Sequence, residues 1–179
     1  MSVLSDADIK REIEAKTLVI KPFDPKQLQP ASYDVCLGPK FLVPMSGLGR
    51  PMSHDFAPVY KAVSANAYTL FPGEFILGRL AEHVTLPSNI CAKIEGKSSL
   101  GRIGLSIHVT AGFVDPGWDG ILTIEMKVEA ITYPINIQVG MKIAQLRFEY
   151  LQTPSEKPYC GRYQGSTDVQ GFKGLKVVE

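Results

Sequence analysis

The feature that most constrains the fold is a long series of short, strand-like runs separated by proline and glycine. Between Leu18 and Leu151 these runs are rich in β-branched and aromatic residues, and they read YDVCLG, KFLV, YTLF, EFILGRL, HVTLP, ICAKIEG, IGLSIHV, GILTIEMKVEA, PINIQVG and MKIAQLRFEYL. Many short strands at such spacing are typical of sandwiches and barrels. One helical pattern precedes them, in which Ser5 caps a short helix that ends near Lys16. The sequence therefore predicts an all-β fold with a short N-terminal helix.

Length and composition favour a single soluble domain over residues 1–179. A chain of this length buries about two-thirds of the surface that its unfolded form exposes. No apolar run approaches the roughly 20 residues of a membrane span, so we expect no membrane association. The polar N-terminus lacks the pattern of a secretory signal, which favours a cytoplasmic location. A net charge of +1 argues against a nucleic-acid partner, because such proteins usually carry a strong basic excess.

The cysteines and histidines show no metal-ligand pattern. Cys36, Cys91 and Cys160 are odd in number and widely spaced, so we expect buried free thiols and no disulfides. The three histidines form no CxxC, HxE or HExxH pattern with them. The sequence therefore predicts no zinc site, and we interpret His108, on an apolar run, as a hydrogen-bonded structural residue.

Two segments lack a strand-like pattern. Residues 44–66 mix proline, glycine and serine, and we expect a long surface loop there that can include a strand fragment. Residues 153–179 form a polar, glycine-rich tail that contains three aromatic residues. The composition leaves two possibilities open for this tail, disorder or ordering over a ligand.

One stretch, residues 95–125, is too polar for an ordinary core. It reads EGKSSLGRIGLSIHVTAGFVDPGWDGILTIE and combines small, cationic, hydroxyl and acidic side chains. Lys97 and Arg102 are candidate partners for an anion, and Ser98 with Ser99 can start a helical turn. The spacing differs from that of a Walker A motif, which excludes a phosphate loop of that type. Taken alone, such a cluster is more often a surface turn.

Two acids in this stretch are candidate functional residues. The run from Ile121 to Glu129 alternates between apolar and polar side chains, which predicts a half-buried strand with Glu125 on its polar face. Asp115 lies in DPGWDG, where Asp-Pro-Gly is ordinary turn chemistry. Each acid taken alone therefore has a structural explanation, a solvated strand face for one and a turn for the other.

The order of the motifs along the chain resembles that of one family. LSDADI, QPASYDVCLG and PGEFILGRL come first, EGKSSLGRIGL, HVTAGFVDPGWDG and LTIE follow, and GMKIAQL and a PY…YQG tail come last. This ordered set is similar to that of the dCTP deaminases, which belong to the trimeric dUTPase superfamily, and the likeness covers residues 4 to about 166. The resemblance implies a distorted jelly-roll or β-barrel subunit, and a homotrimer whose active sites are shared between neighbouring chains.

The resemblance also implies a reaction, the zinc-independent hydrolytic deamination of dCTP to dUTP and ammonia. Such a reaction supplies uracil nucleotides for thymidylate synthesis. By likeness to the family, Glu125 is the general base, and later the acid, that moves the protons. Ser98 is expected to hold the nucleophilic water, and Arg102 is expected to offset the charge that develops during attack.

The resemblance places substrate contacts in several parts of the chain. The residues expected to touch dCTP are Lys97, Ser99 and Gln145 at the triphosphate, Asp115 at the 3′-hydroxyl, Ala111, Thr123 and Ile124 at the base edge through their backbone, and Tyr159 and Arg162 in a tail that closes over the phosphates. Mg²⁺ is expected to bridge the triphosphate oxygens, with no metal held by the protein alone. The tail departs from the family pattern, because Arg162 and Ser166 stand where the family often has lysine and glutamine.

The sequence leaves the end point of the reaction open. Thr110-Ala111 is followed by Gly112-Phe113, a pair that resembles the dUMP-forming branch, in which dUTP is hydrolysed further to dUMP and pyrophosphate. A plain dUTPase, in which Glu125 is vestigial, and a nucleotide-sensing regulatory protein are the alternatives. dTTP is a candidate inhibitor.

Overall fold

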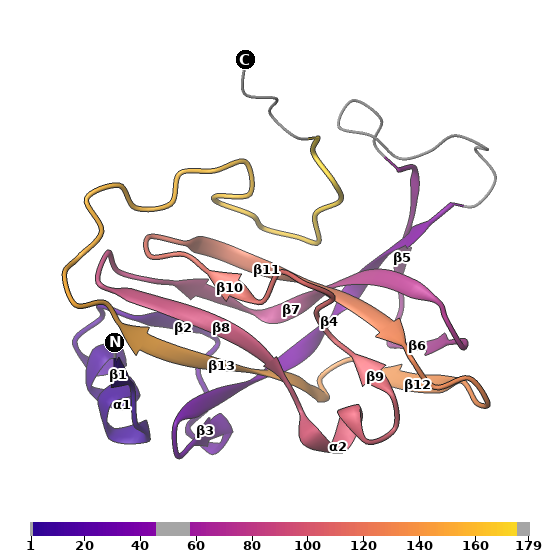
Figure 1. Ribbon diagram of the computed structural model, residues 1–179, viewed down its shortest axis with the longest axis horizontal. Coiled ribbons are helices and arrows are strands. Elements are labelled where there is room, and N and C mark those ends of the chain that lie inside the picture. Colours follow the sequence, from indigo (N-terminus) through magenta and orange to yellow (C-terminus); the bar gives the residue numbers. More distant parts are fainter. Residues whose placement is uncertain (1, 46–57, 175–179) are drawn as a thin grey trace.

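Strands dominate the protein, shown in Figure 1 as a computed structural model that describes residues 2–45 and 58–174. The helical segments are α1 (Asp6–Glu14), η1 (Pro25–Gln27) and α2 (Ser98–Gly101). The strands are β1 (Ser2–Val3), β2 (Val19–Lys21), β3 (Leu28–Gln29), β4 (Ser32–Pro44), β5 (Tyr60–Ser64), β6 (Ala67–Leu70), β7 (Phe75–Thr85), β8 (Ile90–Gly96), β9 (Leu105–Ser106), β10 (Phe113–Val114), β11 (Asp119–Val128), β12 (Ile135–Gln138) and β13 (Lys142–Tyr150). The prediction of an all-β fold is confirmed. None of the described helices is long and apolar enough to cross a membrane.

Strand β4 joins two groups of antiparallel strands into one curled sheet. Its first half pairs with β13, where Asp34 lies opposite Gln145, and its second half pairs with β7 and with β5, where Phe41 lies opposite Val63. The main path of the sheet runs β10-β8-β13-β4-β7-β11-β9, and β12 pairs with β6 in a separate two-stranded sheet. A strand that changes partners in this way turns the corner of an antiparallel fold, so that both groups of strands cover one core.

Two strands are longer than the sequence predicts. YDVCLG and KFLV form one strand, β4, and EFILGRL and HVTLP form another, β7. The register of β4 against β7 shifts between Leu37 and Phe41, which accommodates Pro39, a residue without a backbone donor. A Cβ at Gly38 would lie 2.8 Å from Cγ of Arg79, so glycine is required there. Gly38 and Pro39 therefore mark an irregularity inside β4, where its pairing with β7 shifts register, and not the end of the strand.

The N-terminal helix forms as predicted. The Ser5 side chain accepts a hydrogen bond from the Asp8 amide, and the Asp8 carboxylate accepts one from the Ser5 amide, which together make a capping box. Leu4 and Ile9 flank this cap and are fully buried. The helix ends at Glu14, within two residues of the predicted end.

Two segments differ from the strand pattern of the sequence. IGLSIHV contributes only the two-residue strand β9, because after Ile107 accepts a hydrogen bond from the Glu125 amide (3.2 Å) the chain bends away from β11. Within residues 44–66, the predicted strand fragment is β5, which pairs with the end of β4. The rest of that expected surface loop, residues 46–57, lies outside the described residues.

The side chains of the cysteines and of His108 also differ in part from expectation. All three thiols are free, and Cys91 is buried, but Cys36 is only partly buried and Cys160 is exposed because the tail that carries it lies on the surface. Nδ1 of His108 is buried without a hydrogen-bond partner among the described residues, so the expected hydrogen bond is absent there. A Cβ on Gly112 would lie 3.5 Å from the His108 ring, which shows how closely the loop backbone covers it.

Within residues 153–174 the tail runs back across β11 without forming a helix or a named strand (Figure 1). Its Gly165 amide donates to the Asp119 carbonyl (2.8 Å), and the Ile121 amide donates to the Ser166 carbonyl (2.7 Å). Gly120, between these two strand residues, has a φ of 147°, and a Cβ there would lie 2.8 Å from the Ser166 amide nitrogen. Glycine at this position lets the tail approach the strand closely.

Candidate active site

A cavity of about 360 Å³ opens between β11, the segment around β10 and the tail. The predicted site residues that line it are Ala111, Phe113, Asp115, Thr123, Glu125 and Tyr159. Its other walls include Tyr60, Phe75, Leu77, Trp118, Tyr163, Gln170 and Phe172. Aromatic walls around a few polar groups are the usual character of a small-molecule site. With the exception of Ile124, the structure therefore brings together the residues that the resemblance assigns to the base, the sugar and the general base.

Glu125 is held in this cavity by its strand and by the neighbouring loop. β11 alternates buried and half-buried positions as predicted, and Glu125 is one of the half-buried ones. The Val109 amide donates a hydrogen bond of 3.0 Å to Oε2 of Glu125. Among the described residues nothing hydrogen-bonds to Oε1, which leaves one carboxylate oxygen able to accept a proton from a bound molecule.

The DPGW turn builds the wall of the cavity next to the tail. Gly117 has a φ of 84°, and a Cβ there would lie 2.5 Å from Cβ of Pro158. The Tyr159 amide donates to the Pro116 carbonyl (2.8 Å), and the rings of Trp118 and Tyr159 lie 5.6 Å apart. Sequence reasoning missed Trp118 as a cavity residue, although a tryptophan within a turn was a usable signal, since such a large ring is seldom left in solvent.

The tail forms another wall of the cavity, which it reaches by crossing β11. The Gln170 amide donates a hydrogen bond of 2.9 Å to Oγ1 of Thr123. Two residues earlier, Asp168 forms ion pairs with Lys40 and with Arg79, the second at 3.5 Å. Gln170, Phe172 and Tyr60 were not among the predicted site residues, because only the path of the tail brings them to the cavity.

The predicted triphosphate contacts and two of the predicted catalytic residues form a second group, which we call the Lys97 cluster. It consists of Lys97, Ser99 and Gln145 from the first set and Ser98 and Arg102 from the second. Lys97 precedes α2, and Ser98 opens it, as the predicted helical turn requires. Nε of Arg102 lies 3.4 Å from Oγ of Ser98, and Nε2 of Gln145 donates to the Gly96 carbonyl at 3.3 Å. No member of the cluster lines the Glu125 cavity. Figure 1 shows α2 and the tail on opposite sides of the sheet.

The remaining predicted residues have structural surroundings of their own. Arg162 is exposed, and its guanidinium donates to the Lys173 carbonyl (3.0 Å), which ties two parts of the tail together. Ile124 is 1% exposed and does not line the cavity. Gly112 accepts from the Ile94 amide at 2.7 Å, and a Cβ on it would lie 3.0 Å from the Ile94 carbonyl oxygen. A larger residue would be crowded where the chain enters β10, independently of any role in the reaction.

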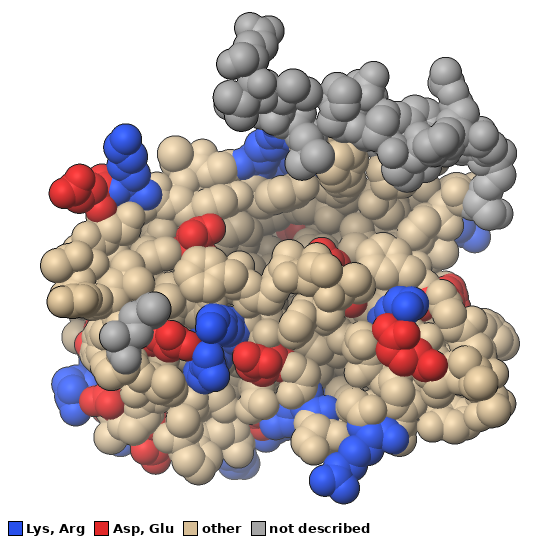
Figure 2. Space-filling model, in the orientation of Figure 1, with Lys and Arg blue, Asp and Glu red and all other residues tan. Residues whose placement is uncertain are grey.

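Charged side chains of both signs are interspersed on the face of the molecule drawn in Figure 2. Lys and Arg do not gather into one basic surface in that view, unlike the stripe that binds a nucleic-acid backbone. Within residues 2–45 and 58–174, no three His, Cys, Asp or Glu side chains are grouped as metal ligands. The described site thus consists of an aromatic cavity that contains the carboxylates of Asp115 and Glu125, and of a separate cationic cluster.

Comparison with known proteins gives a consistent result. A sequence profile of the family described as dCTP deaminase-like matches residues 3–151. A relative from Nocardioides sp., named "dCTP deaminase, dUMP-forming", is 44% identical over 178 residues, which cover 96% of this chain and 92% of the relative. A relative of the same name from Mycolicibacterium smegmatis is 42% identical over 177 residues, covering 96% and 93% of the two chains.

Solved structures share the fold. The crystal structure of 2′-deoxycytidine 5′-triphosphate deaminase from Agrobacterium tumefaciens matches with a TM-score of 0.64 at 24% identity, covering 82% of this chain and 47% of that one, so this chain spans about half its length. A dUTPase of Staphylococcus bacteriophage 80alpha, solved with dUpNHpp, matches with a TM-score of 0.51 at 17% identity, covering 81% and 97%. These two likenesses concern the dUTPase-like fold alone. Together with the family profile and the high identity to the two named relatives, they lead to one conclusion: the chain belongs to the dCTP deaminase-like family.

Proposed function

We propose that the protein is a zinc-independent dCTP deaminase of the dUMP-forming type, built as one dUTPase-like domain over residues 1–179. The observation that carries the proposal is Glu125, whose carboxylate lies in an aromatic cavity. The Val109 amide holds one of its oxygens, and the other has no hydrogen-bond partner among the described residues. The name of the relatives supports dUMP as the product. The Gly112-Phe113 pair, which resembles the dUMP-forming branch, agrees with it.

Glu125 would carry out the proton transfers of deamination. Water attacks C4 of the cytosine ring, and Glu125 accepts the proton that the water loses. The carboxyl passes this proton to N3 of the ring, then takes the proton of the new C4 hydroxyl and delivers it to the amino group, which leaves as ammonia as the C4 carbonyl forms. The hydrogen bond from the Val109 amide fixes the orientation of the carboxylate, so that its free oxygen can meet the water in one geometry.

The cavity walls would select the nucleoside. The backbone at Ala111 and along Thr123, Ile124 and Glu125 would pair with the base edge, where each lost hydrogen bond leaves a buried polar group unpaired at about 1–3 kcal/mol. Asp115 would accept the 3′-hydroxyl. Phe113, Trp118 and Tyr159 would exclude water, and so strengthen each of these contacts.

The Lys97 cluster would complete the cavity of a neighbouring subunit in a homotrimer. Ser98 and Arg102 do not line the cavity of their own chain, although hydrolysis needs a group that positions the water and a cation that offsets developing charge. A cyclic trimer would place the partner subunit's Ser98 and the partner subunit's Arg102 at the Glu125 cavity. Lys97, Ser99 and Gln145 would then meet the triphosphate, and Arg162 of the tail would lie near its outer phosphates.

The residues present fit a magnesium ion that the nucleotide brings with it. Mg²⁺ usually keeps several waters and is bound by substrate phosphates with one or two carboxylates at most. The Lys97 cluster offers ammonium, guanidinium, hydroxyl and amide groups but no carboxylate, so such an ion would be held chiefly by the triphosphate. Bound in this way, the ion would lower the mutual repulsion of the phosphate oxygens.

A product assay tests the function and separates it from its alternatives. Purified protein is incubated with dCTP, and ammonia, dUTP, dUMP and pyrophosphate are separated and quantified. We expect ammonia, dUMP and pyrophosphate in equal amounts. Accumulation of dUTP would identify a deaminase that stops after the first step. Cleavage of added dUTP without any reaction of dCTP would identify a plain dUTPase, and binding without turnover of either would identify a nucleotide sensor.

The role of Glu125 is tested by Glu125→Gln, which keeps the shape of the side chain but cannot accept a proton. We expect ammonia release to fall by at least about 100-fold while dCTP still binds. Glu129→Gln is the matched control, because Glu129 follows the same strand but is exposed and paired with Lys127 at 2.9 Å. Near-normal deamination by the Glu125 variant would refute the assignment. A cytoplasmic location and inhibition by dTTP belong to the same proposal, and added dTTP in this assay tests the second.

A further inference from the structure

Two polar residues of β4 lie beneath the Lys97 cluster and are buried. Ser32 is 8% exposed and Asp34 is 2% exposed. They are two residues apart on one strand, so their side chains point to the same face of the sheet. In the sheet, Asp34 lies directly opposite Gln145 of β13. Buried polar groups at such positions are retained only where they have partners.

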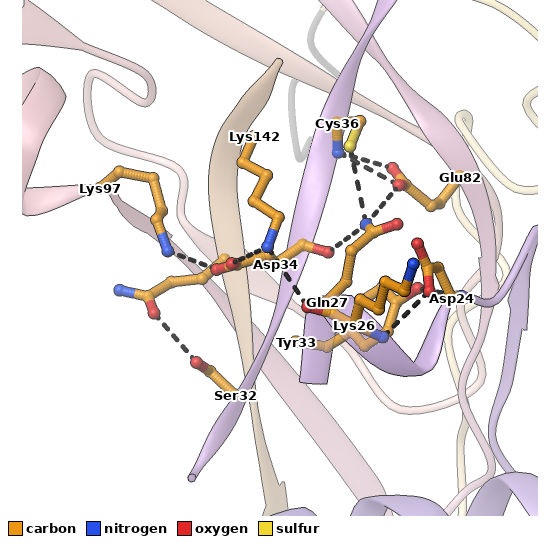
Figure 3. Close-up of polar contacts among 11 residues, drawn as sticks. Asp24, Lys26, Gln27, Ser32, Tyr33, Asp34, Cys36, Glu82, Lys97 and Lys142 are labelled. Atoms are coloured by element: carbon orange, nitrogen blue, oxygen red, sulfur yellow. Dashed lines mark hydrogen bonds and ion pairs between the residues drawn. The ribbon is translucent and has the colours of Figure 1, made fainter. Parts of the chain in front are cut away.

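The partners of Asp34 are two lysine ammonium groups. Oδ1 pairs with Nζ of Lys97, and Oδ2 lies 3.1 Å from Nζ of Lys142. Figure 3 shows Asp34 between the two lysines, with each side chain reaching it from a different element. A lysine side chain is long and flexible, and an ion pair at its tip restricts where the ammonium group can be. One N–H of Lys97 is engaged by Asp34, which leaves two to bind an anion.

The partner of Ser32 is the Gln145 amide. Oγ of Ser32 donates a hydrogen bond of 2.9 Å to Oε1 of Gln145, while Nε2 of Gln145 donates to the Gly96 carbonyl at 3.3 Å. The Ser32 hydroxyl therefore determines which end of the amide faces the sheet. The second N–H of Gln145 remains available to a phosphate oxygen, whereas a flipped amide would present its carbonyl oxygen and repel one.

We propose that Ser32 and Asp34 are positioning residues for the triphosphate, acting through Gln145 and Lys97 without touching the ligand. This inference rests on the proposed function, which places Lys97 and Gln145 at the phosphates. One strand carries both residues, so β4 sets the spacing between the two phosphate donors. Because the arrangement exists before the ligand arrives, less side-chain freedom is lost on binding.

The test compares the steady-state kinetics of wild type, Asp34→Asn and Ser32→Ala with dCTP. We expect KM for dCTP to rise about 10-fold in D34N and about 3-fold in S32A. The value of kcat should stay within 2-fold of wild type, because each change weakens binding of the ground state and of the transition state equally. Glu149→Gln is the matched control. Glu149 is a buried carboxylate on β13 that also pairs with two cations, Arg147 at 2.7 Å and Lys93 at 3.9 Å, but contacts no member of the cluster. E149Q should lower thermal stability without raising KM.

A double-mutant cycle identifies the residue through which Asp34 acts. In a Lys97→Met background, adding D34N should raise KM by less than 2-fold, because the ammonium group that Asp34 positions is already gone. An unchanged KM in both D34N and S32A, an equal rise in E149Q, or a full additional rise in the Lys97→Met background would each overturn the inference. S32A removes a single hydroxyl, and it decides the question if D34N does not fold. Wild-type protein that fails to release ammonia from dCTP would instead refute the proposed function itself.

Discussion

Two glutamates of the same sheet have opposite surroundings, and the difference separates a structural carboxyl from the proposed general base. Glu82 is 2% exposed; its oxygens accept from the Cys36 amide at 2.9 and 3.1 Å and from Nε2 of Gln27 at 3.1 Å. Burial raises the pKa of Glu82, and these hydrogen bonds only partly oppose it. Glu125 is half-buried, and within residues 2–45 and 58–174 only one of its oxygens accepts a hydrogen bond. Hydrogen bonds thus occupy both oxygens of Glu82, whereas the bond from Val109 occupies only one oxygen of Glu125.

The raised pKa of Glu82 predicts a pH dependence of stability. The folded protein holds the proton of this carboxyl more tightly than the unfolded chain does, so the free energy of unfolding falls as the pH rises from the ordinary value of 4.5 through the folded pKa. Glu82→Gln cannot ionise and lacks this loss. Urea unfolding of both proteins across this pH range should show wild type losing stability relative to the variant by at most about 1.4 kcal/mol per pH unit. A constant difference across the range would contradict the prediction.

At the scale of elements, β4 and the tail connect parts of the molecule that are far apart in sequence. The first half of β4 carries Asp34 to the Lys97 cluster, and its second half carries Lys40 to the tail, where Lys40 pairs with Asp168. The tail in turn crosses β11 and reaches the cavity. One strand and one irregular segment thus connect the Lys97 cluster to the cavity within one chain.

The tail should loosen in Asp168→Asn. This change removes the ion pairs to Lys40 and Arg79 but leaves the hydrogen bond between Gln170 and Thr123. Because these are partly exposed pairs, we expect a modest effect, a 2- to 5-fold rise in KM for dCTP and faster tryptic cleavage at Arg162. Unchanged proteolysis and KM would show that the ion pairs do not hold the tail.

The control for the tail variant is Glu14→Gln, which removes the exposed pair between Lys10 and Glu14 on α1. That pair lies on an element away from the cavity, so tryptic cleavage and KM should stay at wild-type values. High salt should reproduce the effect of D168N on the wild-type protein, since it screens exposed charges.

The N-terminal helix offers a prediction about stability alone. Ser5→Ala removes the hydroxyl that accepts from the Asp8 amide. We expect the free energy of unfolding to fall by about 1 kcal/mol, as for other N-cap replacements, with KM for dCTP unchanged. Urea denaturation measures the first quantity. A change in KM would contradict the view that α1 is remote from the site.

At the scale of the whole molecule, the cavity and the Lys97 cluster are separate within one chain. The sheet lies between α2 and the tail in Figure 1, and no cluster residue lines the cavity. A single chain would therefore contribute its cavity to one proposed site and its Lys97 cluster to another. Assembly would be a condition of activity and not only of stability.

Mixed trimers test this arrangement. Glu125→Gln and Arg102→Ala should each be inactive alone, but unfolding and refolding them together in equal amounts should restore about a quarter of wild-type activity. A site works only when its cavity comes from an Arg102 variant chain and its cluster comes from a Glu125 variant chain. Each condition is met in about half of the cases, so about a quarter of the sites are active. Samples mixed without refolding are the control. No recovery after refolding would place the complete site within one chain.

Much of the fold and part of the site could be predicted from local patterns. The helix cap at Ser5 and the alternation around Glu125 depend only on neighbours in sequence, and both are confirmed. The length of β4 could not be predicted, because a glycine followed by a proline usually ends a strand. Here the side chain of Arg79 packs against Gly38, and a shift in register accommodates Pro39. Trp118 was missed as a cavity residue for a similar reason, since its role depends on Tyr159, which is distant in sequence.

The sequence by itself determined the strand-rich class, the capped helix and the ordered motifs that relate the chain to its family. These follow from periodicity and turn chemistry, which act over a few residues. Only the tertiary structure decided that Glu125 and the tail share a cavity, and that Asp34 lies between Lys97 and Lys142. Such contacts join strands and loops that are far apart along the chain. They depend on the register between strands and on the path of the tail, which the packing of the whole core determines and no local pattern encodes.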